Sequence, residues 1–192
     1  MKIFLVLLIL IFGIQSLVKA DDIRDFEIEQ ISLYDNALNF FSTKELKDGK
    51  RNYYSTNKYT TSAIRKKTFE VYEVLHVSYR SNDSNFEILD ISGITFMNYK
   101  KCLKEIEEIS LEFDQMFPKA VKDDLYTYIN NDDPSGKSKV SDIYWFFENR
   151  DVIVLACYYI DNTYGKKNNL KSELRVSISS DEFNKFLISE SQ

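Results

Sequence analysis

The sequence predicts an α+β domain of two layers, in which an antiparallel sheet of about five strands carries helices packed on one face. Several segments alternate apolar and polar residues, as half-buried strands do, and connections of hairpin length separate them. Residues 99–117 instead repeat apolar residues every three or four positions, which is the spacing of an amphipathic helix. With 2 prolines, 5 glycines and 15% aromatic residues, the composition is typical of a packed globule.

The first twenty residues have the pattern of a secretory signal peptide. Met1 and Lys2 form a short basic start, apolar residues follow from 3 to 18, and Val18-Lys19-Ala20 resembles a cleavage site. The apolar run is shorter than the roughly 20 residues that a helix needs to span a bilayer, and a retained membrane anchor is the alternative. We therefore expect residues 1–20 to be cleaved as a signal peptide. Residues 21–192 would then form a single domain that is exported to the periplasm or the cell exterior.

The exported chain is expected to be acidic. The formal net charge is −5, and removal of residues 1–20, which contain two lysines and no acidic residue, changes it to −7. An acidic protein is repelled by nucleic acids and by anionic lipid surfaces, so we expect no nucleic-acid partner. No later segment is apolar enough for a membrane helix, so we expect no stable membrane insertion after signal cleavage.

The first half of this domain is expected to contain two short helices followed by a β-hairpin. Apolar residues from 33 to 41 recur at helical spacing after Ser32, a suitable N-cap, and a second helix is expected from Lys44 to about Lys50. Two alternating segments then form the hairpin, and the turn-forming residues 81–85 separate them. We expect the hairpin strands at residues 68–80 and 86–97, with a brief edge strand at residues 26–29 and mostly loop at residues 51–67.

The second half is expected to contain one long helix, three strands and a final helix. Asn98 can cap the helix at residues 99–117, and Pro118 ends it. Ser179 and Glu182 fit a capping box that begins the last helix. The strands are expected to pair as an antiparallel meander at residues 140–148, 152–160 and 170–179. The intervening segments 118–139 and 161–169 are expected to be irregular.

Cys102 and Cys157 are the two cysteines of the chain, and both follow the predicted cleavage site. In an oxidising compartment an even number of cysteines favours a disulfide. Closing a loop of this length stabilises a fold by about 4 kcal/mol in the chain-entropy model. Two separate buried thiols are the alternative.

His76 is the only histidine and the first candidate for a catalytic residue. It lies within the predicted strand 68–80, where it could act as a general base with a serine or cysteine nucleophile and an acid. A half-exposed strand residue is the alternative, because the chain has no G-x-S-x-G motif. An acidic pair such as Asp181 and Glu182 could instead serve a hydrolase, although acidic residues also favour helix N-termini. One histidine and two cysteines do not provide a zinc site, and we expect neither a metal nor a cofactor.

The loop near residue 133 resembles two binding motifs and matches neither. Gly136-Lys137-Ser138 imitates the end of a P-loop, but Asn131 stands where that motif has its first glycine. Asp132 and Asp133 could offer oxygen atoms to calcium, but the EF-hand spacing is absent. We expect a solvated turn. On another predicted turn, Asn82-Asp83-Ser84 matches an N-glycosylation acceptor.

Three segments resemble a family of small exported proteins from AT-rich marine alphaproteobacteria. They begin with Asp25-Phe26-Glu27-Ile28-Glu29, with Pro134-Ser135-Gly136-Lys137-Ser138 and with Leu170-Lys171. The family has no assigned activity, so the resemblance implies an exported domain and supplies no catalytic residue. Residues 31–97 are also similar to the helix-pair-and-sheet modules of β-lactamase-inhibitor-like and outer-membrane-assembly accessory proteins, which bind other proteins.

Three classes of function follow from these observations. We expect a non-catalytic exported domain that binds a protein or an envelope partner, because no catalytic motif is complete and tyrosines concentrate at residues 53–59 and 158–164. These tyrosines could also serve sheet packing. The alternatives are a small hydrolase that uses His76 or an acidic pair, and a carrier of a small apolar ligand, which needs an apolar cavity.

Overall fold

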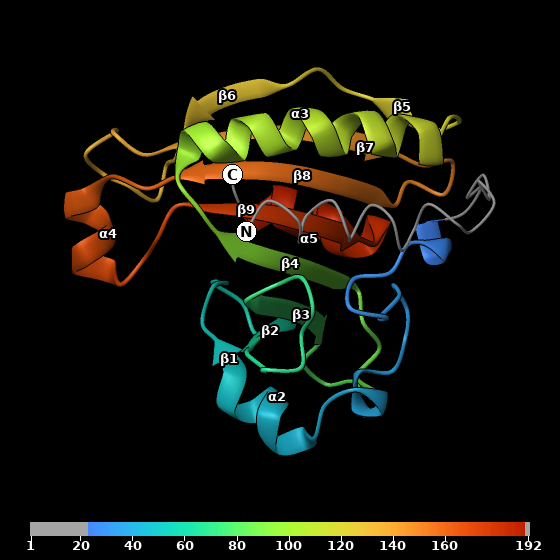
Figure 1. Ribbon diagram of the computed structural model, residues 1–192. Helices are drawn as coiled ribbons and strands as arrows, with labels where there is room; N and C mark the ends of the chain where they lie inside the picture. Colours follow the sequence, from blue (N-terminus) through green and yellow to red (C-terminus); the bar gives the residue numbers. More distant parts are fainter. Residues whose placement is uncertain (1–22, 191–192) are drawn as a thin grey trace.

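The computed structural model describes residues 23–190, which form an α+β fold around one antiparallel sheet of nine strands (Figure 1). The strands lie in the order β1-β2-β3-β4-β9-β8-β7-β5, and β6 also pairs with β7. Their bounds are β1 Lys50–Arg51, β2 Tyr59–Ile64, β3 Val74–Arg80, β4 Asp90–Phe96, β5 Val121–Lys122, β6 Tyr126–Ile129, β7 Lys139–Phe146, β8 Val152–Tyr159 and β9 Glu173–Ser179. The α-helices are α2 Thr43–Gly49, α3 Tyr99–Met116, α4 Asn162–Asn168 and α5 Asp181–Glu190. The predicted α+β class is confirmed, and the predicted signal peptide lies outside the described residues.

The sheet is larger than the predicted one of about five strands. The five predicted strands are present as the β3–β4 hairpin and the β7–β8–β9 meander, but the hairpin strands begin at Val74 and Asp90 rather than at residues 68 and 86. The additional strand β2 and the second residue of β1 lie within residues 51–67, which were expected to be mostly loop. Strands β5 and β6 lie within residues 118–139, which were expected to be irregular. All side chains of β1, β5 and β6 are exposed, so these edge strands lack the alternation that identifies a half-buried strand.

Helix α3 covers one face of the sheet by packing across β8 and β9 (Figure 1). Asn98 caps it as predicted, because its side chain accepts a hydrogen bond from the Lys101 N–H at 2.9 Å. The buried side of α3 meets Trp145 of β7, whose ring lies 5.3 Å from that of Phe113 in an edge-on arrangement. The predicted disulfide between Cys102 of α3 and Cys157 of β8 is present, with 5.7 Å between the Cα atoms.

The N-terminal segment also lies on the α3 side, but it does not form the helix predicted after Ser32. It contains two short 3₁₀ turns, Ile23–Asp25 and Ala37–Asn39, and the expected edge strand is reduced to a bridge between Ile28 and Ile31. The apolar residues at helical spacing are buried from a mainly irregular chain, because Ala37 N–H bonds the Phe86 carbonyl outside the segment. The second helix, α2, is present and begins at a capping box formed by Ser42 and Glu45.

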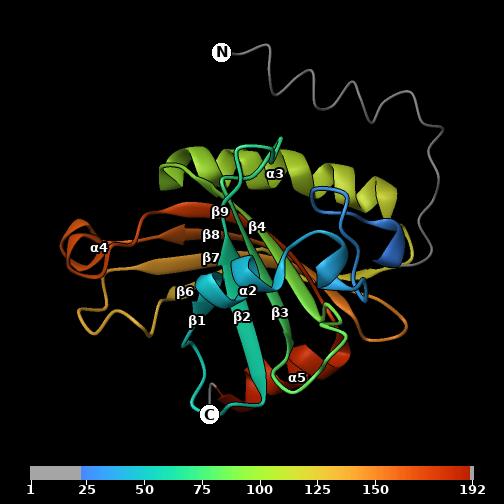
Figure 2. The same cartoon turned by 90° about the horizontal axis from the view of Figure 1, so that it is seen from below.

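Helix α5 lies across the sheet from α3 (Figure 2). Its Phe183 and Phe186 form a separate cluster with Tyr59 and Leu89. The helix is capped by Ser180 rather than by the predicted Ser179, since the Ser180 hydroxyl accepts from the Phe183 N–H at 3.2 Å. α5 covers only the end of the sheet at which β4 begins and β9 ends. The predicted helical layer on one face is therefore formed by α2 and α3.

The expected loop 161–169 contains the short helix α4. Asp161 caps its first turn by accepting from the Thr163 N–H at 3.0 Å, and Asn169 ends it in the left-handed conformation. The following strand begins at Glu173 and not at Leu170. Within residues 23–190, no helix has both the length and the apolar character needed to cross a membrane.

Gly93 of β4 is required by the close approach of an aromatic ring. A Cβ atom at this position would lie 2.6 Å from three ring carbons of Tyr72, which packs against the α3-side core. We expect Gly93→Ala to lower the free energy of unfolding by about 1–3 kcal/mol, because the ring must move from its packed position. Urea denaturation would measure this loss. In a Tyr72→Leu background the same substitution should lower the free energy of unfolding by less. An equal decrease in both backgrounds would contradict a clash with the Tyr72 ring.

Candidate functional site

The candidate functional surface is the sheet face turned away from α3. We call it the open face and define it by His76, Phe96, Tyr144, Tyr158 and Arg175. Strand register places its central row across five strands, in the order His76, Ser92, Ser177, Val154 and Tyr144. Within the described residues, α5 covers only one end of this face (Figure 2). Elsewhere on this face, long side chains such as His76 and Arg175 are half-buried, and short ones such as Ser92 and Ser177 are buried.

Cationic side chains gather on the open face and rest on its aromatic rings. The guanidinium of Arg175 lies 4.8 Å from the Tyr158 ring centre. Arg65 and Lys171 lie 5.7 and 5.2 Å from the centre of the Phe96 ring. Such cation–π contacts hold the charged groups in place without neutralising them.

A fourth cation, Arg51, extends the group to β1, and we call Arg51, Arg65, Lys171 and Arg175 the cationic cluster. Arg175 is paired with Glu173 at 2.6 Å. Arg51, Arg65 and Lys171 form no ion pair with any carboxylate of residues 23–190. The cluster therefore presents unneutralised positive charge on a protein whose net charge is −5.

His76 lies beside this cluster in a position unsuited to base catalysis. Its ring packs 5.7 Å from that of Tyr53 and has no hydrogen-bond partner within residues 23–190. Burial, followed by the charges of nearby arginines including Arg175, lowers the pKa of His76 to about 3. Ser92, its neighbour on β4, instead accepts a hydrogen bond from Ser177 at 2.8 Å. The structure thus brings no nucleophile and acid together with His76.

Asp90 is the buried acid of this face, at the end that α5 covers. Its carboxylate accepts a hydrogen bond from Ser78 at 3.3 Å and lies 3.5 Å from the Ser92 hydroxyl. Ser78 bonds Thr61, which bonds Tyr54, so a chain of hydroxyl groups leads toward the α5 cluster. Burial raises the pKa of Asp90 to about 7, although Arg175 and the serine hydroxyls oppose the shift.

The opposite side of the open face is aromatic and reaches the exposed edge strand β6. Tyr126 and Tyr128 stack with ring centres 6.0 Å apart, and Tyr144 and Phe146 stack at 5.8 Å. Asp142 lies among them and accepts a hydrogen bond from the Tyr128 hydroxyl at 2.8 Å. Tyr128 thus has an exposed ring and a hydrogen-bonded hydroxyl, a combination that is typical of tyrosines at surfaces that bind other molecules.

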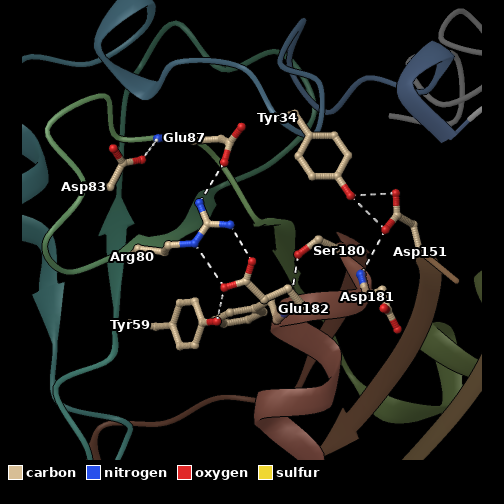
Figure 3. Close-up of polar contacts among 10 residues, drawn as sticks. Tyr34, Tyr59, Arg80, Asp83, Glu87, Asp151, Ser180, Asp181 and Glu182 are labelled. Atoms are coloured by element: carbon tan, nitrogen blue, oxygen red, sulfur yellow. Dashed lines mark hydrogen bonds and ion pairs between the residues drawn. The ribbon is translucent and has the colours of Figure 1, made fainter. Parts of the chain in front are cut away.

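A separate polar network fastens α5 to the sheet (Figure 3). Arg80, the last residue of β3, donates from Nε to Glu182 at 3.0 Å and from Nη1 to Glu87 at 2.8 Å. Its second terminal nitrogen and the Tyr59 hydroxyl also bond Glu182. The hydrogen bond to Arg80 lowers the pKa of Glu182, so this carboxyl is ionised and paired. The network holds the helix and leaves Arg80 without a free binding edge.

The predicted acidic pair does not form a joint site. Asp181 is paired with Lys185 at 2.6 Å, whereas its neighbour Glu182 bonds Arg80. The Asp181 N–H bonds Asp151, which also accepts from Tyr34 at 2.8 and 2.9 Å (Figure 3). Each carboxylate therefore has its own structural partner.

Two clefts flank this network. One, of about 590 Å³, lies along α5 and is lined mainly by polar and charged residues, among them Lys58, Asp181 and Glu190. The other, of about 380 Å³, lies beside Arg80 and Glu87. Neither has the apolar lining that a carrier of apolar ligands requires.

The predicted turn near residue 133 is built around an inward-pointing acid. Asp133 is buried and accepts from the Ser138 hydroxyl at 2.6 Å and from the Ser135 N–H at 2.9 Å. These hydrogen bonds lower the pKa of Asp133 to about 2. Its carboxylate is used to hold the turn, and no group of three or more metal-ligating acids, cysteines or histidines occurs in residues 23–190. Asn82 is exposed on its turn, as the glycosylation motif requires.

Sequence reasoning identified His76 and the tyrosine-rich segments but missed the cationic cluster. Alternation along the last strand places Arg175 and Lys171 outward, and this was the available signal. The position of Arg51 and Arg65 beside them depends on the pairing of distant strands. In comparisons with known proteins, no family model, curated protein or solved structure matches this chain.

Proposed function

We propose that this chain is an exported, non-catalytic domain that binds a protein or envelope partner through the open face. The observation that carries this proposal is the open face itself, which presents aromatic rings and arginines and is covered by a helix at only one end. Tyrosine and arginine are the residue types, with tryptophan, that dominate binding energy at protein interfaces. The disulfide between Cys102 and Cys157 is compatible with an oxidising compartment outside the cytosol.

The alternative functions have less support. A hydrolase based on His76 requires a hydrogen-bonded nucleophile, and the imidazole has no such partner within the described residues. An apolar-ligand carrier requires an apolar cavity, whereas the clefts along α5 and beside Arg80 are lined mainly by polar and charged residues. A surface that combines aromatic rings with charged groups suits a macromolecular partner better than either of these functions.

The proposal is tested by removing the most exposed rings at the two sides of the surface. Tyr53 packs on His76 and is 55% exposed, and Tyr126 on β6 is 68% exposed. We expect the double variant Tyr53→Ser, Tyr126→Ser to lose about tenfold or more in affinity for the partner, because hot-spot rings contribute roughly 1–2 kcal/mol each. The measurement is capture from envelope extract, identification of the captured component, and titration of that purified component.

The matched control is Leu111→Ser, which removes an equally exposed apolar side chain (64%) from α3 on the other side of the sheet. Binding should be unchanged in this variant. Equal affinity of the control and the double tyrosine variant would contradict a binding role for the open face. Thermal unfolding of all three proteins shows whether lost binding reflects lost folding.

A further inference from the structure

We propose that the partner presents an acidic, extended polypeptide segment, whose carboxylates pair with the cationic cluster on the open face. This inference rests on the proposed function and specifies the chemistry of the partner. The open face complements such a segment in charge, because Arg65 and Lys171 are held over the Phe96 ring and have no carboxylate partner within residues 23–190.

Three members of the cluster, Arg51, Arg65 and Lys171, have no carboxylate partner within residues 23–190. Arg65 and Lys171 lie over the same Phe96 ring, so their charged ends are positioned by the sheet. Preorganised cations lose less side-chain entropy when an anion binds, and arginine can hold a carboxylate with two parallel hydrogen bonds.

The cationic cluster spans several neighbouring strands of the sheet. Arg51 extends from β1 and Arg175 from β9, and β2, β3 and β4 lie between them. At about 4.8 Å between neighbouring strands, the backbones of the two residues are separated by roughly 19 Å along the sheet. Their side chains both extend toward the middle of this span, because the charges of both arginines act on His76. An extended chain with several acidic groups can follow such a row of cations from strand to strand.

Between the cations lie the rings of Tyr53, Phe96 and Tyr158, two of which are already covered by a guanidinium or ammonium group. The aromatic surface continues through Tyr144 to the stacked pair on β6. A combination of arginine and tyrosine side chains is the composition of a protein–protein hot spot, which favours a polypeptide over an acidic glycan.

The test uses the full exported domain and a synthetic peptide of twelve residues in which glutamate alternates with threonine. We expect binding by isothermal titration calorimetry with Kd of about 0.1 mM, and a several-fold weaker affinity when NaCl is raised from 50 to 300 mM. The imidazole signal of His76, the only histidine, should shift in NMR spectra on addition of the peptide. A peptide with glutamine in place of every glutamate should not bind.

The decisive variant is Arg65→Gln, Lys171→Gln, which removes two exposed cations without touching the core. It should weaken peptide binding about tenfold. The control Lys100→Gln, Lys101→Gln removes the same charge from α3, on the covered face, and should bind as the unmodified domain does.

Equal binding of the glutamate and glutamine peptides, or equal affinity of the two charge variants, would overturn the inference. Tighter binding of polygalacturonate than of the peptide would also overturn it, because the ligand would then be an acidic glycan. The proposed function would survive these results if the Tyr53→Ser, Tyr126→Ser variant still lost its partner. If that variant still bound both the partner and the peptide, the result would contradict the proposed function itself.

Discussion

Removing the disulfide should lower the free energy of unfolding by about 4 kcal/mol, as the chain-entropy model predicts for a bridge that spans 55 positions. The double substitution Cys102→Ala, Cys157→Ala tests this result. Both side chains are fully buried between α3 and β8, so their loss also leaves a small cavity in the main core. The measurement is urea denaturation of the variant and the unmodified domain. Comparing how steeply the free energy of unfolding falls with urea concentration detects changes in the unfolded state.

Reduction of the unmodified domain separates the covalent bond from the cavity. The reduced protein retains both sulfur atoms, so no cavity forms in its core. Its loss in free energy of unfolding should approach that of the double variant, because we expect the broken bond to cost more than the cavity. Coincident denaturation curves of oxidised and reduced protein would contradict a stabilising role for the bond. A mass increase of two daltons on reduction confirms that the bond was present in the sample.

Asp90→Asn should stabilise the domain at pH 8 and have little effect at pH 4. Below about pH 4 Asp90 is protonated in both the folded and the unfolded state. Because burial raises its folded-state pKa to about 7, the unfolded state ionises first as the pH rises, and the free energy of unfolding falls. Above pH 7 both states are ionised and the loss is complete. The expected gain at pH 8 is on the order of 2–4 kcal/mol, since each pKa unit corresponds to about 1.4 kcal/mol.

Urea denaturation between pH 4 and pH 8 measures this difference. Asp48→Asn is the control, because Asp48 is an exposed carboxylate paired with Lys44 on α2. The Asp48 variant should follow the unmodified domain across this range, whereas the Asp90 variant should diverge from it with rising pH. Parallel curves for the Asp90 variant and the unmodified domain would show that the carboxyl of Asp90 ionises normally in the folded state.

Part of the fold follows directly from local sequence patterns. The five central strands and α3 were predicted because each buries one face or stripe in the core, and this burial creates a period of two or of about 3.6 in the apolar residues. The disulfide partner was predicted because the chain contains only Cys102 and Cys157. Capping chemistry identified Asn98 as the N-cap of α3, since a cap depends on residues within one turn.

The remaining elements lack such local signals. The strands β1, β5 and β6 are exposed on both sides, so their residues carry no alternation, and they form because their backbone groups pair with a neighbouring strand. The segment after Ser32 has helical apolar spacing, but hydrogen bonds to residues 86–88 compete with helix formation. In these places, contacts with distant parts of the chain override local preference.

The sequence by itself determined the α+β class, the central strands, the long helix and the single disulfide, because each depends on residue spacing or on the count of a residue type. Only the tertiary structure decided which side chains share the open face. β9 inserts between β4 and β8 and thereby brings Arg175 toward Arg65 and His76, which lie about a hundred positions earlier in the chain. No local pattern records this pairing, because strand order results from the long-range packing that minimises the free energy of the whole sheet.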